Sequence, residues 1–398
     1  MHKIERLLQT LAPKGVEFRK LGEVINILKG KQLNKELLLD YGEYPVMNGG
    51  IHASGYWNEY NTDYPKIIIS QGGASAGYVN YMTSKFWAGA HCYAIELNSE
   101  KLNYKFLYYF LKNSQTILMK SQFGAGIPAL NKADIETLTI PIPPLEIQQE
   151  IVKILDAFTE LNTELNTELK ARKKQYQYYQ NMLLDFKGIP SNHKDANISQ
   201  KTYPKRLKTL LQTLAPKGVE FRKLGEVLEY DQPNKYCVTS KEFDKSYPTP
   251  VLTAGKTFIL GYTNEKDNIY QASKNAPVII FDDFTTATQW VDFPFKVKSS
   301  AMKILLPKNP TINIRFIFFY MQTIPYNISG EHTRQWISRY SQITIPIPPL
   351  EIQQEIVKIL DAFTELNTEL NTELKARKKQ YEYYREKLLT FKPLQNKA

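Results

Sequence analysis

The sequence predicts an α+β protein in which two mixed α/β domains are separated by a long antiparallel two-helix coiled coil, forming an internal repeat with pseudo-two-fold symmetry. The phrase LLQTLAPKGVEFRKLGEV occurs at Leu7–Val24 and again at Leu210–Val227. A longer phrase beginning TIPIPPLEIQQEI occurs at Thr139–Tyr176 and again at Thr344–Tyr381. The segments between the two phrases do not match. The chain is therefore a tandem duplication in which one fixed frame surrounds two different inserts.

Each module begins with a short amphipathic helix, predicted at Arg6–Leu11 and after Lys205, that stops before the proline of LAPKG. The inserts that follow contain several short apolar runs typical of strands. PKIIISQ, AGYVNYM and AHCYAIEL in the first insert correspond to APVIIFD, TATQWVDF and SAMKILLP in the second. An aromatic helix follows each set, NYKFLYYFLKN or NIRFIFFYMQT. Both inserts are therefore predicted to be mixed domains built on one template.

The longer phrase predicts an extended segment followed by a helix, because IPIPP cannot continue a helix. Apolar residues then recur at spacings of three and four over some forty residues, a helix of about 60 Å. A single amphipathic helix packed on its own domain is the alternative, but a stripe this long favours a partner helix. The predicted coiled-coil seam comprises Ile151, Ile154, Phe158, Leu161 and Leu165, with Ile356, Ile359, Phe363, Leu366 and Leu370 in the second copy.

These patterns divide the chain into five parts. They are a first domain with its short frame segment (1–138), a frame helix (139–187), a polar linker (188–209), a second domain (210–343), and a second frame helix with the C-terminal tail (344–398).

Composition limits the class of protein. A hydrophobic fraction of 42% over 398 residues indicates a folded chain with two or three domains. The longest apolar runs fall far short of the roughly 18 residues of a membrane span, and no secretory signal is visible at the start. Cys92 and Cys237 lie in different inserts without metal-ligand spacing, which predicts a reducing cytoplasm, no disulfide and no metal site. The formal charge of +11 favours a polyanionic partner, either nucleic acid or a membrane surface.

The sequence contains no evident catalytic constellation. GGASAG at Gly72–Gly77 lacks the Lys-Ser/Thr of a P-loop and is predicted to be a tight turn. FDDF at Phe281–Phe284 has no acidic equivalent in the first insert, which argues against the paired carboxylates of a nuclease. No methyltransferase motif is present, and the five histidines form no triad.

The doubled arrangement of two variable domains, each running into PIPPLEIQQEIV and a long helix, resembles the specificity subunit of type I restriction–modification enzymes. The resemblance implies that each insert is a target recognition domain for one half of a bipartite, asymmetric DNA site. It also implies that the helices act as a ruler and that two modification subunits dock on the frame and methylate adenine. S-adenosylmethionine would bind those methyltransferase subunits, and ATP and Mg would bind restriction subunits that join them. The chain itself would then hold no cofactor and perform no catalysis. The tetrads TELNTELNTELK at Thr159–Lys170 and Thr364–Lys375 resemble short repeats in the central helices of the family.

Three other functions remain open at this point. The first is a stand-alone DNA-binding or architectural protein, the second a coiled-coil adaptor that joins two protein ligands, and the third an enzyme in its own right. Base reading favours Arg, Asn and Gln, and phosphate contacts favour Lys and Arg. A solvated surface side chain is the alternative reading for every candidate. The candidate DNA-binding residues are Lys29, Lys31, Lys120, Gln122, Asn131 and Lys132 in the first domain, and Lys256, Arg334, Gln335 and Arg339 in the second.

Overall fold

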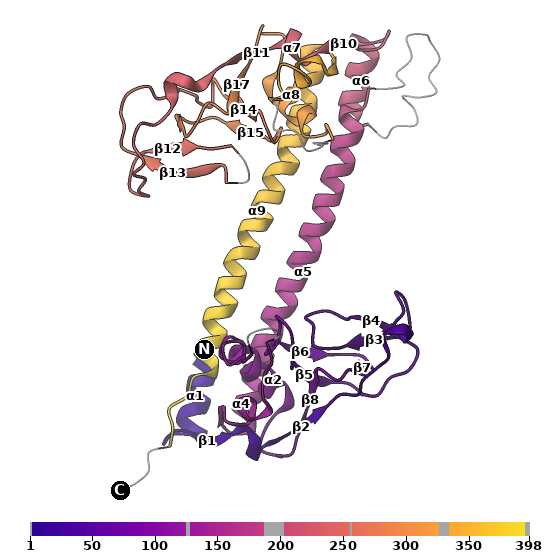
Figure 1. Ribbon diagram of the computed structural model, residues 1–398, viewed down its shortest axis with the longest axis vertical. Coiled ribbons are helices and arrows are strands. Elements are labelled where there is room, and N and C mark those ends of the chain that lie inside the picture. The colour runs from indigo at the N-terminus through magenta and orange to yellow at the C-terminus, as the bar shows by residue number, and fades with distance from the viewer. Residues whose placement is uncertain (1, 125–127, 187–202, 255–256, 326–333, 395–398) are drawn as a thin grey trace. The chain divides into compact units, whose positions relative to one another are not determined.

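The computed structural model describes residues 2–124, 128–186, 203–254, 257–325 and 334–394. The chain forms two compact units (Figure 1). Unit 1 comprises Met1–Thr167 and Thr372–Ala398, and unit 2 comprises Glu168–Asn371. Each unit therefore combines one insert with parts of both copies of the frame.

Unit 1 contains a four-stranded sheet in the order β2-β8-β5-β6, a three-stranded sheet in the order β4-β3-β7 and the two-stranded ladder β1-β9. Its strands are β1 (Glu17–Lys20), β2 (Ile25–Lys29), β3 (Tyr44–Met47), β4 (Gly55–Trp57), β5 (Lys66–Ser70), β6 (Val79–Met82), β7 (Trp87–Ala88), β8 (Cys92–Leu97) and β9 (Thr139–Ile142). Its helices within and before the insert are α1 (His2–Leu11), α2 (Tyr104–Asn113), α3 (Gln115–Lys120) and α4 (Lys132–Glu136), with 3₁₀ turns η1 (Leu21–Glu23) and η2 (Lys35–Leu37).

Unit 2 repeats this topology, with sheets in the orders β11-β17-β14-β15 and β13-β12-β16 and the ladder β10-β18. Its strands are β10 (Glu220–Lys223), β11 (Leu228–Asp231), β12 (Thr249–Leu252), β13 (Ile259–Thr263), β14 (Val278–Asp282), β15 (Thr288–Val291), β16 (Lys296–Val297), β17 (Met302–Pro307) and β18 (Thr344–Ile347). Its helices are α6 (Lys205–Leu214), α7 (Leu224–Val227) and α8 (Ile314–Met321), with 3₁₀ turns η3 (Pro233–Tyr236) and η4 (Tyr340–Gln342). Two inserts of different sequence therefore share one fold.

The central strand of each larger sheet explains why the inserts fold alike. Four of the five residues of β5 and all five of β14 are buried, and β-branched or aromatic side chains fill most of these positions. The helix that follows each sheet begins at an asparagine N-cap. The side chain of Asn103 accepts from the N–H groups of residues 105 and 106. The side chain of Asn313 accepts from the N–H groups of residues 315 and 316.

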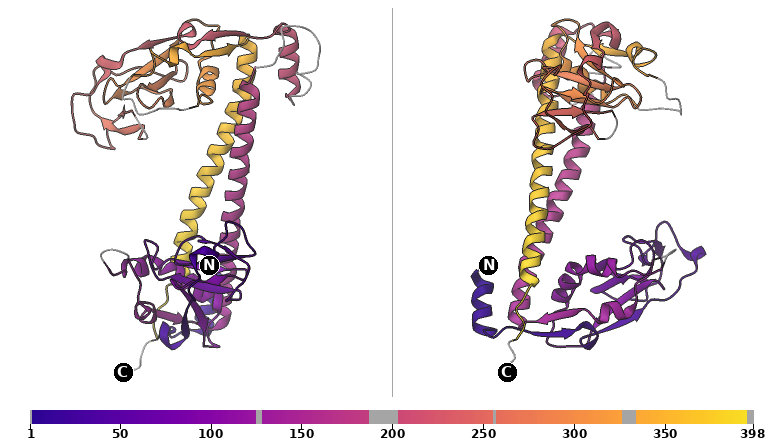
Figure 2. Two further views of the ribbon diagram at one scale, coloured as in Figure 1. Left: turned by 45° about the vertical axis from the view of Figure 1, so that its right-hand side comes forward. Right: turned by 60° about the vertical axis from the view of Figure 1, so that its left-hand side comes forward.

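Both long helices are unbroken ribbons (Figure 2), α5 over Leu145–Leu184 and α9 over Leu350–Leu389. In unit 1 the ring centroid of Phe158 lies 5.6 Å from that of Tyr384 and 6.4 Å from that of Tyr381. Nearer the start of α5, Ile151 shares a core with Leu388 and Leu389. Residues further along α5 therefore contact residues nearer the start of α9, so the two helices are antiparallel.

The same pairing recurs in unit 2, where Phe363 of α9 stacks on Tyr179 of α5 with ring centroids 5.1 Å apart. The predicted α+β class, with mixed domains and an antiparallel helix pair, is confirmed. Ile151 and Ile356 of the predicted seam are fully buried, and the other eight seam residues are half-buried. Leu155 and Leu360, which were not assigned to the seam, are also fully buried, because this part of each helix packs on the neighbouring domain core as well.

Candidate nucleic-acid interface

The frame closes each insert with an identical ladder. β1 pairs with β9 so that Arg19 lies opposite Ile140, and β10 pairs with β18 so that Arg222 lies opposite Ile345. The N–H of Leu21 donates to the carbonyl of Leu138 at 2.8 Å, and the N–H of Leu224 donates to Ile343 at 2.9 Å. Both ends of each insert are therefore held at one fixed point of the frame.

A buried glutamine of the frame then connects each insert to its long helix. Gln148 accepts from the N–H of Asn103 at 2.7 Å, and its amide donates to the carbonyls of Pro143 and Lys101 at 2.6 and 2.8 Å. Its side chain is fully buried. Every polar atom of that side chain is thus used to join the start of the helix to the N-cap of the insert helix α2.

Gln353 repeats these contacts in unit 2. It accepts from the N–H of Asn313 at 2.8 Å and donates to Pro348 and Thr311 at 2.7 and 3.1 Å. The neighbouring glutamines of the repeated QQ pair, Gln149 and Gln354, are exposed. One glutamine of each pair therefore has a structural role, and the other faces solvent.

An ion pair between insert and frame also recurs in different chemical forms. Lys105 lies 2.9 Å from Asp156 in unit 1, and Arg315 lies 2.8 Å from Asp361 in unit 2. Tyr109 donates to Asp156 at 2.5 Å. Burial raises the pKa of Tyr109, and its hydrogen bond to Asp156 raises it further. The frame aspartate accepts either a lysine or an arginine, so the frame can hold inserts of different sequence.

The segment Arg334–Arg339, called here the 334–339 turn, lies at the end of the second insert, shortly before β18. Arg334 and Arg339 are exposed, whereas Gln335 is only 2% exposed. The carbonyl of Gln335 accepts from the N–H groups of Arg339 and Tyr340 at 3.1 and 3.0 Å. The turn therefore presents its two arginines to solvent and keeps Gln335 inside.

The equivalent segment of unit 1 carries Asn131 and Lys132, both exposed at the start of α4. The N–H of Asn131 donates to Asp134 at 3.2 Å, and Lys132 lies 3.3 Å from Glu136. Lys120 is exposed at the end of α3, and the half-buried Gln122 donates to the carbonyl of Ala76 at 2.7 Å. These four residues come from two short helices and the loop after one of them.

The remaining candidates are more scattered. Lys29 ends β2 opposite Tyr93, and Lys31 is two residues further on; both are exposed. The N–H of Lys31 donates to Ala88 at 2.8 Å, and its carbonyl accepts from the indole of Trp87 at 3.0 Å. Lys256 lies outside the described residues. Arg334 and Arg339 thus lie on one turn, whereas Lys29 and Lys31 lie at and just after the end of β2.

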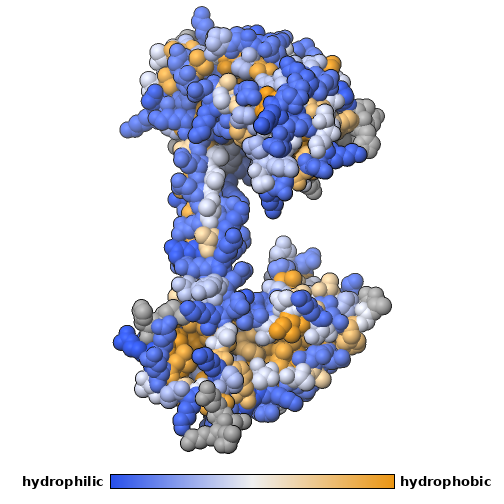
Figure 3. Space-filling view, turned by 90° about the vertical axis from the view of Figure 1, so that its left-hand side faces the viewer, coloured by the Kyte–Doolittle hydropathy of each residue, from blue (hydrophilic) through white to orange (hydrophobic). Residues whose placement is uncertain are grey.

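Large apolar side chains also reach the surface of the first insert, and Figure 3 shows orange areas on unit 1, the lower unit in that view. Apolar contacts with thymine methyl groups contribute to base reading. No periodic pattern in the sequence indicated these residues, because they lie in irregular loops and short strands. The exposed members from the end of η2 to the start of β5 are Leu37, Leu39, Tyr41, Ile51, Tyr56, Tyr60 and Tyr64.

The described part of the chain holds no group of three or more His, Cys, Asp or Glu side chains placed to bind a metal ion. None of its helices is both long enough and apolar enough to cross a membrane.

Comparison with known proteins gives a consistent result. Residues 13–174 and 216–378 both match the family model of the type I restriction modification DNA specificity domain. The chain is 57% identical over 184 residues to the EcoR124I/EcoR124II specificity subunit of Escherichia coli, a match that covers 44% of this chain and 45% of that one. It is 30% identical to a putative type I restriction enzyme specificity subunit of Haemophilus influenzae over 98% of both chains.

A solved structure shows the same fold. The crystal structure of the type I restriction-modification S subunit from M. genitalium matches with a TM-score of 0.69 at 21% identity, covering 94% of this chain and 96% of that one. The two family matches coincide with the two copies of the repeat, each spanning an insert and most of its frame helix. The chain therefore belongs to the type I restriction–modification DNA specificity family and carries two copies of its domain.

Proposed function

We propose that the chain is the DNA-specificity subunit of a type I restriction–modification enzyme. Each insert reads one half of a bipartite, asymmetric DNA site, and the helical frame sets the spacer and docks the modification subunits. One observation carries this proposal: Gln148 and Gln353 make the same contacts to backbone groups of two inserts whose sequences differ. A frame that holds unlike inserts in the same way suits a protein that reads two unlike sequences.

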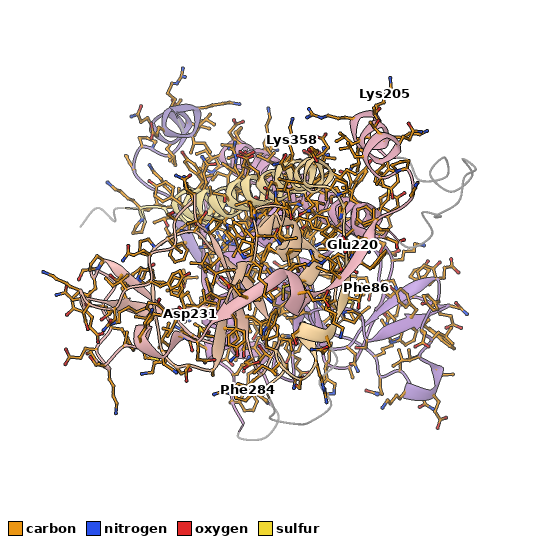
Figure 4. The ribbon with its side chains drawn as sticks, turned by 90° about the horizontal axis from the view of Figure 1, so that it is seen from above. Phe86, Lys205, Glu220, Asp231, Phe284 and Lys358 are labelled. Atoms are coloured by element: carbon orange, nitrogen blue, oxygen red, sulfur yellow. The ribbon has the colours of Figure 1, made fainter. Side chains whose placement is uncertain are left out.

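The proposal assigns the docking of partners to the exposed face at the start of each long helix. Glu146, Gln149 and Lys153 are exposed on α5 at spacings of three and four, so they lie on one face of the helix. The same three residue types are exposed on α9, ending with Lys358, which Figure 4 labels. Two equal faces match two copies of one modification subunit. Methylation with S-adenosylmethionine and ATP-driven restriction with Mg then reside on partner subunits, and the complex acts on DNA in the cytoplasm.

The proposal is tested by co-expressing the chain with the modification subunit encoded beside it and mapping methylated adenines on genomic DNA. The expected result is co-purification and methylation of a single bipartite sequence with a fixed spacer. Purification without a methyltransferase, together with tight DNA binding, would favour a stand-alone DNA-binding protein. A coiled-coil adaptor would show no duplex binding, whereas binding by a DNA reader falls steeply as salt concentration rises.

Replacing Arg334 by alanine is expected to alter the preferred bases in one half-site and leave the other half-site unchanged. An arginine that contacts a base edge contributes about 1–3 kcal/mol of discrimination, roughly 5- to 150-fold. The measurement is a competition assay over DNA libraries in which one half-site is randomised at a time.

Asn131→Ala is the matched control, because Asn131 occupies the equivalent segment of the first domain and should affect only the other half-site. Equal weakening on all sequences by Arg334→Ala would mean that Arg334 contacts phosphates and does not read bases.

A further inference from the structure

A buried ion pair lies next to the 334–339 turn of unit 2. Lys303 on β17 and Asp283, which directly follows β14, are 2% and 1% exposed, and their Nζ and Oδ2 atoms lie 3.6 Å apart. A buried charge is costly unless it is paired and hydrogen-bonded. The ion pair at this position therefore carries a desolvation cost that a neutral pair would not have.

Asp283 is hydrogen-bonded to the backbone of the 334–339 turn. Its backbone carbonyl accepts from the N–H of Gln335 at 2.8 Å, and its side-chain Oδ1 accepts from the N–H of Trp336 at 2.8 Å. Trp336 is buried and packs edge-on against Phe281, with ring centroids 5.2 Å apart. One residue thus holds two successive amides of the turn, immediately after Arg334.

Lys303 supports Asp283 from the neighbouring strand. Its ammonium group also donates to the side chain of Gln232 and lies 4.5 Å from the centre of the Tyr230 ring. Burial lowers the pKa of Lys303, Asp283 opposes this shift by raising it, and Arg334 lowers it. The positive charge of Arg334 therefore acts on Lys303.

Unit 1 has neutral side chains at the two equivalent positions, and the N–H of Asn131, the counterpart of Trp336, donates to Asp134 instead. The N–H of Leu130 donates to the carbonyl of Gln71 at 2.8 Å, which reproduces the contact between Gln335 and Asp283. Tyr93 occupies on β8 the position that Lys303 occupies on β17, and its hydroxyl donates to the carbonyl of Leu130 at 3.3 Å. Gln71 and Tyr93 thus stand where unit 2 has Asp283 and Lys303.

We infer that Asp283 and Lys303 are positioning residues that fix the direction of Arg334 and Arg339 toward the second half-site. This inference rests on the proposed function, since it assigns a role in DNA reading. The backbone contact at the end of the central strand is common to both domains. The side chains that hold the turn differ, so each insert fixes the conformation of its own turn with its own residues. Figure 4 labels Phe284, the residue after Asp283 and the second residue beyond the end of β14.

The experiment uses the double variant Asp283→Gln/Lys303→Tyr in the full chain bound to its modification subunits. This variant places the neutral side chains of unit 1 at these positions, so no charge is left buried alone, and it removes the carboxylate that accepts from the N–H of Trp336. Three quantities are measured: thermal unfolding, amide hydrogen exchange of the peptide covering 334–340 without DNA, and base discrimination at each half-site. We expect near-wild-type unfolding, faster exchange in the peptide and about tenfold lower discrimination at the second half-site only, as for the loss of one hydrogen bond to a charged group.

Two further variants keep the inference testable if the double variant does not fold. Gln232→Ala removes only the side chain that accepts from Lys303 and should change exchange and discrimination in the same direction by a smaller factor. Lys303→Arg retains the charge and should keep both hydrogen exchange and base discrimination at their wild-type values. A folded double variant, or Gln232→Ala, with wild-type exchange and wild-type discrimination would overturn the inference.

The exchange measurement separates this inference from the proposed function. A wild-type complex without sequence-selective DNA binding would contradict the proposed function, while faster exchange in the double variant would still support the anchor. Normal DNA reading by the wild type, combined with equal loss at both half-sites in the double variant, would contradict the anchor alone.

Discussion

Adding one TELN tetrad to each long helix is expected to abolish methylation of the original DNA site and to move it to the same half-sites with a longer spacer. Four helical residues add about 6 Å and about 400° of rotation, one turn plus roughly 40°. B-DNA rises about 3.4 Å and turns about 35° per base pair. The expected spacer is therefore longer by about one, at most two, base pairs.

The contacts within the tetrads explain why such an insertion is tolerated. The hydroxyls of Thr159 and Thr163 donate to the carbonyls four residues earlier at 2.8 Å, and Thr364 and Thr368 do the same on α9. Each of these hydroxyls thus donates within its own helix. The threonine of an added tetrad therefore needs no acceptor on the other helix.

Methylation mapping of the lengthened chain is the measurement. The control is Glu164→Ala with Glu369→Ala, which changes exposed tetrad residues without changing length and should leave the spacer as it is. An unchanged spacer in an active lengthened chain would show that these helices do not measure the distance.

The second large effect is expected on stability. Gln353→Ala should lower the free energy of unfolding of unit 2 by about 2–4 kcal/mol, because it leaves the half-buried N–H of Asn313 and two carbonyls without their partner. Gln148→Ala should do the same in unit 1. Chemical unfolding of the two variants, followed separately by hydrogen exchange in each unit, measures the effect.

The repeated QQ pair supplies its own control. Gln354→Ala and Gln149→Ala change the neighbouring exposed glutamines and should alter stability by no more than about 0.5 kcal/mol. If Gln353→Ala costs no more than Gln354→Ala, the buried glutamine does not connect the frame to the insert.

Much of the frame could be predicted from the sequence because its signals are local. The prolines of IPIPP require an extended segment, and that segment is β9 or β18. The apolar spacing predicts the long helices, and Phe158 and Phe363 do contact rings of the partner helix. The burial of Leu155 and Leu360 could not be predicted from a heptad seam, because it depends on the packing of each helix against an insert core.

The candidate site was less accessible to sequence reasoning. The sequence indicated Arg334, Gln335 and Arg339 as equal candidates, but only the structure shows that Arg334 and Arg339 face solvent while Gln335 is buried. FDDF suggested only a nuclease motif, which the sequence then disfavoured. The partner of Asp283 is Lys303, on a strand that pairs with β14 from later in the chain, and no local pattern predicts such a contact.

The central claim is that a fixed frame holds two independent readers, and exchange of one insert tests it most directly. Residues 25–138 are replaced by the insert of another family member that supplies its own asparagine N-cap for Gln148, and methylated sites are mapped for the chimera. The account predicts that one half-site changes to that of the donor while the other half-site is preserved. Loss of both specificities in a chimera that folds and binds its modification subunits would contradict it.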